Sequence, residues 1–95
     1  SITLPLTLRE IGDEAFMFCD KLSELIIPEG VVSIGSRAFD GCSSLKSIAL
    51  PSTLKEIGNW AFYCSNLEEV VIPRCIESIV KSCDLYCLTK LVYID

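Results

Sequence analysis

Histidine is absent from this chain of 95 residues, and basic residues are few, with 8 Lys and Arg against 13 Asp and Glu. The lack of histidine removes the most common general base, the usual physiological proton switch and the most common nitrogen ligand of metal ions. The net charge of -5 has the wrong sign for a surface that neutralises phosphates. Nucleic acids and anionic membranes are therefore poor partners for this chain.

Long apolar runs are also absent. No run approaches the roughly 20 residues that a membrane-spanning helix requires, and no basic-then-apolar signal peptide opens the chain. Hydrophobic residues nevertheless make up 51% of the chain, which is too many for a disordered tail or linker. We therefore expect one folded domain with no membrane insertion.

The four prolines reveal an internal repeat, because Pro5, Pro28, Pro51 and Pro73 follow one another at steps of 23, 23 and 22 residues. Other residue types recur at nearly the same step. They are Ile11, Ile34, Ile57 and Ile79; Gly12, Gly35 and Gly58; Phe16, Phe39 and Phe62; and Cys19, Cys42, Cys64 and Cys87. A period of 20 to 29 residues with apolar positions at i, i+3 and i+5 is typical of a leucine-rich-repeat solenoid.

Each repeat predicts a strand that ends at a corner. In residues 22–27 the side chains of Leu25 and Ile27 point to one face and those of Glu24 and Ile26 to the other. Pro28 then ends the strand because it has no N–H group to donate. The segments 13–16, 36–39 and 59–62 predict a short helical or 3₁₀ turn that places Ala and Phe in the core.

The run from Ile34 to Pro51, IGSRAFDGCSSLKSIALP, resembles the BspA-like, treponemal-type class of leucine-rich repeats, and similar runs cover nearly the whole chain. The period and the resemblance predict an α/β fold. It is a right-handed leucine-rich-repeat solenoid with one parallel β-sheet and short strands and 3₁₀ turns on the other side.

We expect a single domain over residues 1–95, with repeats at about 1–27, 28–50, 51–72 and 73–95. The opening residues 2–5 match the tail of a strand and the closing residues 91–95 match a complete one, which would give about five rungs. Neither end shows a polar capping repeat, so we expect the chain to be a fragment of a longer array.

The fourth repeat departs furthest from the pattern. Val80 stands in place of glycine, Cys83 in place of alanine and Asp84 in place of phenylalanine. We expect either a shifted turn with Leu85 or Tyr86 as the substitute, or a loosened coil.

The cysteine column is interpreted as reduced thiols in the core, because Cys19, Cys42, Cys64 and Cys87 occupy one repeat position before a core leucine. A disulfide within the group Cys75, Cys83 and Cys87 is the alternative in the fourth repeat. Connectivity does not follow from sequence alone.

Metal and enzyme hypotheses find little support. The chain offers Cys83 and Cys87 four residues apart, without the paired Cys-x-x-Cys ligands that a structural zinc site uses. A nucleophilic cysteine has no histidine beside it. Adjacent carboxylates at Glu68 and Glu69 point to opposite faces of a strand. We therefore predict no enzyme, no metal and no cofactor. Trp60 is expected either exposed or lying over the aliphatic stems of its neighbours.

The outward positions of the long sheet form the candidate binding surface. One predicted column is Glu24, Ser47, Glu69 and Tyr93, and a second is Thr3, Ile26, Ala49, Val71 and Asp95. The candidate ligand-binding residues on this concave face are Glu24, Ile26, Ser47, Ala49, Glu69, Val71 and Tyr93. Exposed neighbouring apolar residues mark a binding site or pack across rungs, and both interpretations stay open.

The resemblance implies a non-catalytic interaction module of a cell-surface or secreted protein that binds a protein or glycan partner in adhesion. The alternative is a structural spacer with no ligand of its own. Exposed strand edges also favour edge-to-edge self-association.

Overall fold

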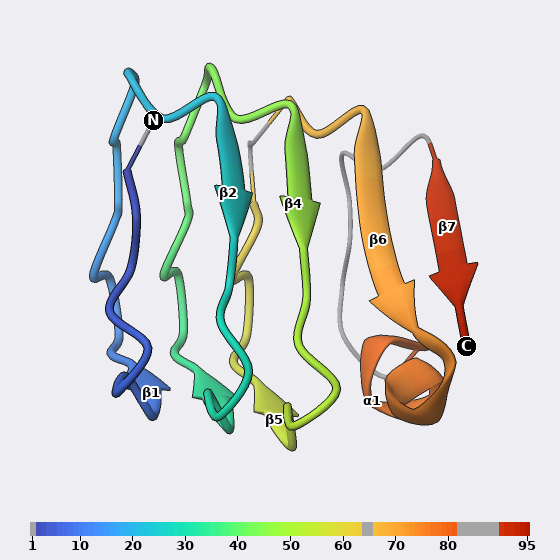
Figure 1. Cartoon of the computed structure of the whole chain (residues 1–95). Helices are drawn as coiled ribbons and strands as arrows, with labels where there is room; N and C mark the ends of the chain where they lie inside the picture. Colours follow the sequence, from blue (N-terminus) through green and yellow to red (C-terminus); the bar gives the residue numbers. More distant parts are fainter. Residues whose placement is uncertain (1, 64–65, 82–89) are drawn as a thin grey trace.

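The computed structural model describes residues 2–63, 66–81 and 90–95. Within these residues the chain winds through successive coils that stack side by side (Figure 1). The strands are β1 (Glu10–Ile11), β2 (Glu24–Ile26), β3 (Ser33–Ile34), β4 (Ser47–Ala49), β5 (Glu56–Ile57), β6 (Glu69–Pro73) and β7 (Leu91–Ile94). One 3₁₀ helix, η1 (Arg74–Ile76), leads into a single short α-helix, α1 (Glu77–Lys81).

The strands form two parallel sheets on opposite sides of the coils. The long sheet has the order β2-β4-β6-β7, and the second sheet has the order β1-β3-β5. Each of the first three coils contributes one strand to each sheet, and the register between these coils follows the sequence repeat, with Leu25 beside Ile48 and Ile34 beside Ile57. The predicted leucine-rich-repeat solenoid is therefore confirmed, with about three turns and little helix.

The core lies between the two sheets and is built from the repeated apolar positions. Leu25, Ile48 and Val70 are buried from the long sheet, and Ile11 and Ile34 are buried from the second sheet. The repeated phenylalanines fill the third side of each coil. The rings of Phe16, Phe39 and Phe62 are stacked, with centroids 5.3 and 5.4 Å apart. Stacked coils thus bury side chains that one coil could not bury alone.

The segments that lead into the phenylalanines differ from the predicted helical or 3₁₀ turn. In the first coil the Ala15 nitrogen donates to the Gly12 oxygen over 3.2 Å, and Glu14 between them has a φ of 59°. Arg37 and Trp60 repeat this left-handed conformation in the next coils, at 57° and 59°. A positive φ at the third residue is the geometry of a type II turn, which cannot continue as a helix.

The fourth coil carries a helix where the pattern would place a further strand of the second sheet. Pro73 lies inside β6, beside Ile94 of β7, rather than after the strand as the other prolines do. The chain then enters η1 and α1, and α1 contacts β5. Val80, in place of glycine, is buried in this helix. The substitutes expected at Leu85 or Tyr86 lie outside the described residues.

The expected strand at residues 2–4 is wrong, because this segment pairs with no strand in the described residues. The long sheet therefore has four strands in the described residues, with β2 at one edge and β7 at the other (Figure 1). In the same residues, no helix has the length and apolar character that crossing a membrane requires.

Candidate functional site

The outward side chains of the long sheet come together as the sequence predicts for the first three rungs. Glu24, Ser47 and Glu69 are neighbours in register on β2, β4 and β6, and we call them the acidic column. Ile26, Ala49 and Val71 lie in register two residues further along the same strands. The side chains between the two columns face the core, because successive residues of a strand alternate between faces.

The prediction that Tyr93 continues the acidic column is wrong. In β7 Tyr93 pairs with Ile72, so its side chain belongs to the core-facing column and packs against the core. The Arg74 guanidinium lies over its ring, 5.1 Å from the centroid. Tyr93 thus lies three residues away from its predicted partner Glu69, and a register difference of an odd number of residues places a side chain on the opposite face of the sheet. Four consecutive apolar residues in β7 gave no alternation from which this register could be predicted.

The residues that replace Tyr93 on the outer face are Lys90 and Val92. Val92 pairs with Val71 and extends the second column to four residues, which we call the apolar stripe: Ile26, Ala49, Val71 and Val92. Ile26 is 77% exposed, and the other three are half-buried. The stripe is thus open to solvent rather than covered by the chain's own side chains in the described residues.

The acidic column is only partly neutralised. The Lys90 ammonium lies 3.3 Å from the Glu69 carboxylate, and both side chains are largely exposed, so this pair is weak. Glu24 is exposed and makes no ion pair with any described residue. The β2 end of the column therefore carries an uncompensated negative charge beside the exposed Ile26.

A groove of about 410 Å³ borders this end of the stripe. It lies between the segment of residues 2–6 and the edge of β2. Its lining is mostly apolar and consists of Ile2, Thr3, Leu4, Leu6, Glu24, Leu25, Ile26 and Pro28. We call it the edge groove. It gives the otherwise flat outer face a hollow in which a side chain can be buried.

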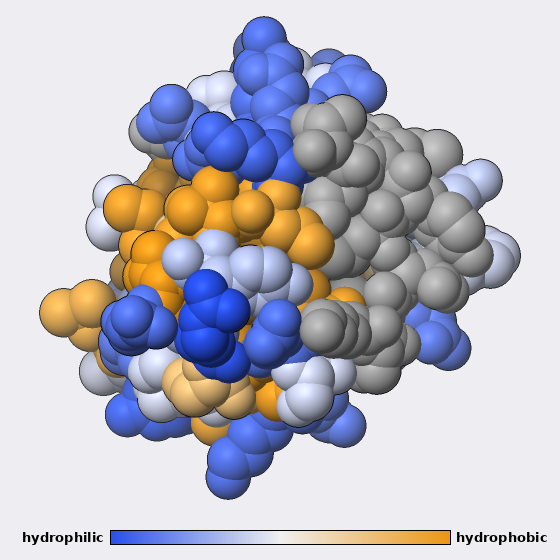
Figure 2. Space-filling view, turned by 90° about the vertical axis from the view of Figure 1, so that its right-hand side faces the viewer, coloured by the Kyte–Doolittle hydropathy of each residue, from blue (hydrophilic) through white to orange (hydrophobic). Residues whose placement is uncertain are grey.

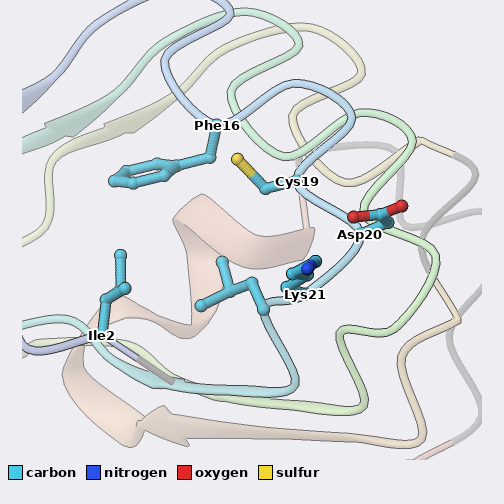
Figure 3. Close-up of a pocket in the computed structure, with 6 residues that line it drawn as sticks. Ile2, Phe16, Cys19, Asp20 and Lys21 are labelled. Atoms are coloured by element: carbon cyan, nitrogen blue, oxygen red, sulfur yellow. The ribbon is translucent and has the colours of Figure 1, made fainter.

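A second cavity, of about 430 Å³, opens at the N-terminal end of the core. Figure 3 shows Ile2 and Phe16 on opposite sides of this opening, with the sulfur of Cys19 directed toward the Phe16 ring. Apolar side chains also gather on the C-terminal end of the solenoid (Figure 2), where Leu91 and Ile94 are exposed. Apolar side chains of the described residues are therefore exposed in both places.

The described cysteines differ in burial. The Cys42 thiol is fully buried and donates to the Phe16 carbonyl oxygen over 3.0 Å. Burial raises the pKa of the Cys42 thiol to about 11, so thiolate is scarce at neutral pH. Cys19 is half-buried, and Cys75 is exposed and free. Cys64, Cys83 and Cys87 lie outside the described residues, as does any disulfide between the last two.

Trp60 is 39% exposed, as one of the two interpretations predicts, and its ring contacts a charged group rather than the aliphatic stems of the other interpretation. The Arg37 guanidinium is 4.5 Å from the centre of the Trp60 ring, and Tyr63 stacks on the same residue at 5.3 Å. Arg37 also pairs with the buried Asp40 over 2.9 Å. The contact between Arg37 and Trp60 joins the second and third coils.

In residues 2–63, 66–81 and 90–95, no three Cys, Asp or Glu side chains converge in a way that could hold a metal ion. A polar groove of about 320 Å³ on the second sheet runs over Gly12, Gly35 and Gly58, with Glu10 and Glu56 at its sides. The groove is open because these three glycines have no side chains to fill it.

The comparison with known families assigns the chain. A family model described as "BspA type Leucine rich repeat region (6 copies)" matches residues 1–95, so the chain belongs to the BspA-type leucine-rich-repeat family. Comparisons with curated proteins and with solved structures gave no match. Proteins of this repeat class are in general non-catalytic repeat modules, and their repeats commonly serve protein interaction.

Proposed function

We propose that this chain is a non-catalytic interaction module of a cell-surface or secreted protein, and that it binds a protein partner through the outer face of the long sheet. The observation that carries the proposal is the apolar stripe, whose Ile26 is 77% exposed beside Glu24, which makes no ion pair in the described residues. Contiguous apolar surface bordered by charge is typical of interaction sites. The surface location rests on the family resemblance.

A protein partner is favoured over a glycan because the acidic column and the apolar stripe have no aromatic side chain. Sugar rings commonly stack their C–H face on an aromatic side chain. Tyr93 is the aromatic residue among the candidate ligand-binding residues predicted from the sequence. Because Tyr93 faces the core, the acidic column and the apolar stripe contain no aromatic residue. Aliphatic and acidic side chains in neighbouring columns instead suit a segment with apolar and basic side chains.

The test compares two substitutions to glutamate. Ala49→Glu places a charge in the centre of the apolar stripe, whereas Ser43→Glu places the same charge at an exposed position outside the sheet. Both variants and the wild type are measured by biolayer interferometry against purified extracellular proteins and immobilised glycans. We expect a protein ligand whose affinity falls at least about tenfold in Ala49→Glu and stays unchanged in Ser43→Glu.

Three outcomes would contradict the proposal. If neither a protein nor a glycan binds, the chain acts as the structural spacer of the alternative hypothesis. If Ala49→Glu binds a protein as well as the wild type does, the binding surface is not the apolar stripe. If only glycans bind, the partner class is wrong. Thermal unfolding of each variant, followed by circular dichroism, separates lost binding from lost folding.

A further inference from the structure

A turn that follows the second sheet brings together side chains from the second and third coils. In the second coil the Asp40 nitrogen donates to the Arg37 oxygen over 3.2 Å. In the third coil the Tyr63 nitrogen donates to the Trp60 oxygen over 3.1 Å. The two turns lie in register, because the Arg37 nitrogen donates to the Asn59 oxygen over 3.0 Å. We call the four side chains the corner cluster: Arg37, Asp40, Trp60 and Tyr63.

The corner cluster is held in place by a buried charge. The residue Asp40 is only 6% exposed, and its carboxylate accepts a hydrogen bond from Nη1 of Arg37 over 2.9 Å. This bond fixes the guanidinium over the Trp60 ring, on which Tyr63 also stacks. A guanidinium has more N–H groups than this bond uses, so Arg37 retains donors for a ligand. Such support is typical of a preorganised site.

The two aromatic rings are exposed, although the turn does not require them. Trp60 is 39% exposed and Tyr63 is 37% exposed. The first coil has Glu14 and Met17 at the same positions, joined by the same backbone hydrogen bond over 3.2 Å. Glu14 and Trp60 also share a φ of 59°. Since the turn forms without aromatic residues, the exposed rings point to binding, for which Trp and Tyr are enriched.

A hollow of about 350 Å³ lies beside the indole and is lined by Ser36, Arg37, Asn59 and Trp60. Its volume is at the lower end of the range of about 300–1,000 Å³ that is typical of small-ligand sites. The Ser36 hydroxyl, the Asn59 amide and the Trp60 indole N–H make no hydrogen bond with any described residue. The hollow therefore combines an aromatic wall with polar groups that are available to a ligand.

We propose that the corner cluster binds a neutral oligosaccharide. A sugar ring has an apolar C–H face and hydroxyl groups around its rim. The C–H face packs against the exposed surface of Trp60, because the negative face of an aromatic ring attracts the weakly positive C–H groups. The hydroxyl groups bond to the Asn59 amide and to the remaining N–H groups of Arg37. This site supplies the aromatic rings that the outer face of the long sheet lacks, and it is independent of the proposed function.

The charges around the hollow favour a neutral sugar over an anionic one. Asp40 compensates the charge of Arg37. Another carboxylate adjoins the hollow, because the Ser36 nitrogen donates to Oδ1 of Asp13 over 2.9 Å. The whole chain has a net charge of -5. A carboxylate or sulfate group on the sugar would therefore be repelled.

The first test uses the fluorescence of Trp60, which is the only tryptophan of the chain and so reports binding at this site. The protein is titrated with neutral oligosaccharides of glucose, galactose, mannose and N-acetylglucosamine, and with heparin oligosaccharides as the anionic probe. We expect a saturable change in emission with at least one neutral probe, with a Kd below about 10 mM, and none with heparin. No change with any neutral probe, or a response to heparin alone, would overturn the proposal.

The second test exchanges the aromatic residue, with isothermal titration calorimetry of the neutral probe that binds best as the readout. Trp60→Glu gives the third coil the residue that Glu14 supplies in the first, in the same backbone conformation, so we expect the fold to persist. Binding should weaken about tenfold or more in Trp60→Glu and by no more than about threefold in Trp60→Phe, which keeps a ring. Equal binding by Trp60→Glu and the wild type would overturn the proposal.

A third variant keeps the test decisive if thermal unfolding shows that Trp60→Glu does not fold. Asn59→Ala changes an exposed side chain that contacts no described residue through a hydrogen bond. It should weaken binding of the same sugar by about threefold or more through the loss of the amide. Unchanged binding by Asn59→Ala would contradict the assignment of the hollow.

The sugar and the protein ligand of the proposed function distinguish the two proposals. If Ala49→Glu loses the protein ligand and binds the sugar normally, while Trp60→Glu does the reverse, both proposals stand. If the sugar binds at Trp60 and no protein binds the outer face, the proposed function fails alone. If a proline-rich peptide changes the emission of Trp60 and no sugar does, the corner cluster recognises protein and the sugar proposal fails.

Discussion

A Cβ atom on Gly35 would lie 2.4 Å from the backbone nitrogen of Asp13 in the preceding coil. Gly58 stands in the same relation to Ser36, whose nitrogen would be 2.3 Å away. The obstacle in each case is backbone, which has no alternative rotamer. The glycine column therefore permits the close spacing of coils that the stacked core requires.

Gly35→Ala is expected to lower the free energy of unfolding by about 2–3 kcal/mol, because the added methyl group forces the first two coils apart. Gly12→Ala is the matched control. A Cβ atom there would meet nothing within 4 Å, so this substitution should be neutral or stabilise the fold by up to about 1 kcal/mol. Urea unfolding of both variants measures the difference. Equal destabilisation would contradict the close approach at Gly35.

The middle ring of the phenylalanine stack should dominate the stability of the central coil. Phe39 has none of its surface exposed and contacts a ring on each side at 5.3 and 5.4 Å. Phe39→Ala should lower the free energy of unfolding by about 3–5 kcal/mol through the cavity that it leaves. The exposed Phe18 is the control, and Phe18→Ala should cost less than about 1 kcal/mol in the same urea titration.

The sequence predicts the regular coils because one period repeats the same physical constraints. Glycine, alanine and phenylalanine recur where backbones approach and rings stack, and the alternation in residues 24–27 separates the outer face from the core. For this reason the positions of Ile26 and Ala49 on the outer face could be predicted without coordinates. Whether they bind a ligand stays a prediction.

One error falls where the period breaks, and another lies within the regular coils. Tyr93 pairs with Ile72, three residues from its predicted partner Glu69, and a difference of an odd number of residues reverses the face of the strand. The residues of β7 are all apolar, so no alternation in the sequence indicates which face is buried. The left-handed conformation of Glu14, Arg37 and Trp60 was also missed. Positive φ is usually signalled by glycine or asparagine, and here the repeat imposes it on other residues.

This imposed conformation gives a further prediction. Glu14 has a φ of 59° and is exposed, so a side chain there costs energy with little compensation from packing. Glu14→Gly should raise the free energy of unfolding by about 0.5–1 kcal/mol, whereas Glu14→Ala should not. Thermal unfolding compares the two variants. A loss of stability in Glu14→Gly would show that the side chain makes a stabilising contact.

Burial of the Cys42 thiol predicts how stability depends on pH. The pKa is raised from 9.0 to about 11 in the folded protein because the thiolate would lose its hydration. The folded state therefore keeps the proton where the unfolded state releases it. Stability from this group is present below pH 9 and is lost as the pH rises from about 9 to 11, by about 2–3 kcal/mol in total.

Lysine and tyrosine side chains titrate in the same range, so the prediction concerns a difference between variants. Cys42→Ala should unfold with a shallower loss of stability between pH 9 and 11 than the wild type, because alanine releases no proton from the unfolded chain. Cys75→Ala removes an exposed thiol and should follow the wild-type slope. Guanidinium titrations at half-unit steps of pH measure the three slopes. If Cys42→Ala and the wild type lose stability in parallel, the Cys42 thiolate must be solvated in the folded state, and its place inside the stacked core would be wrong.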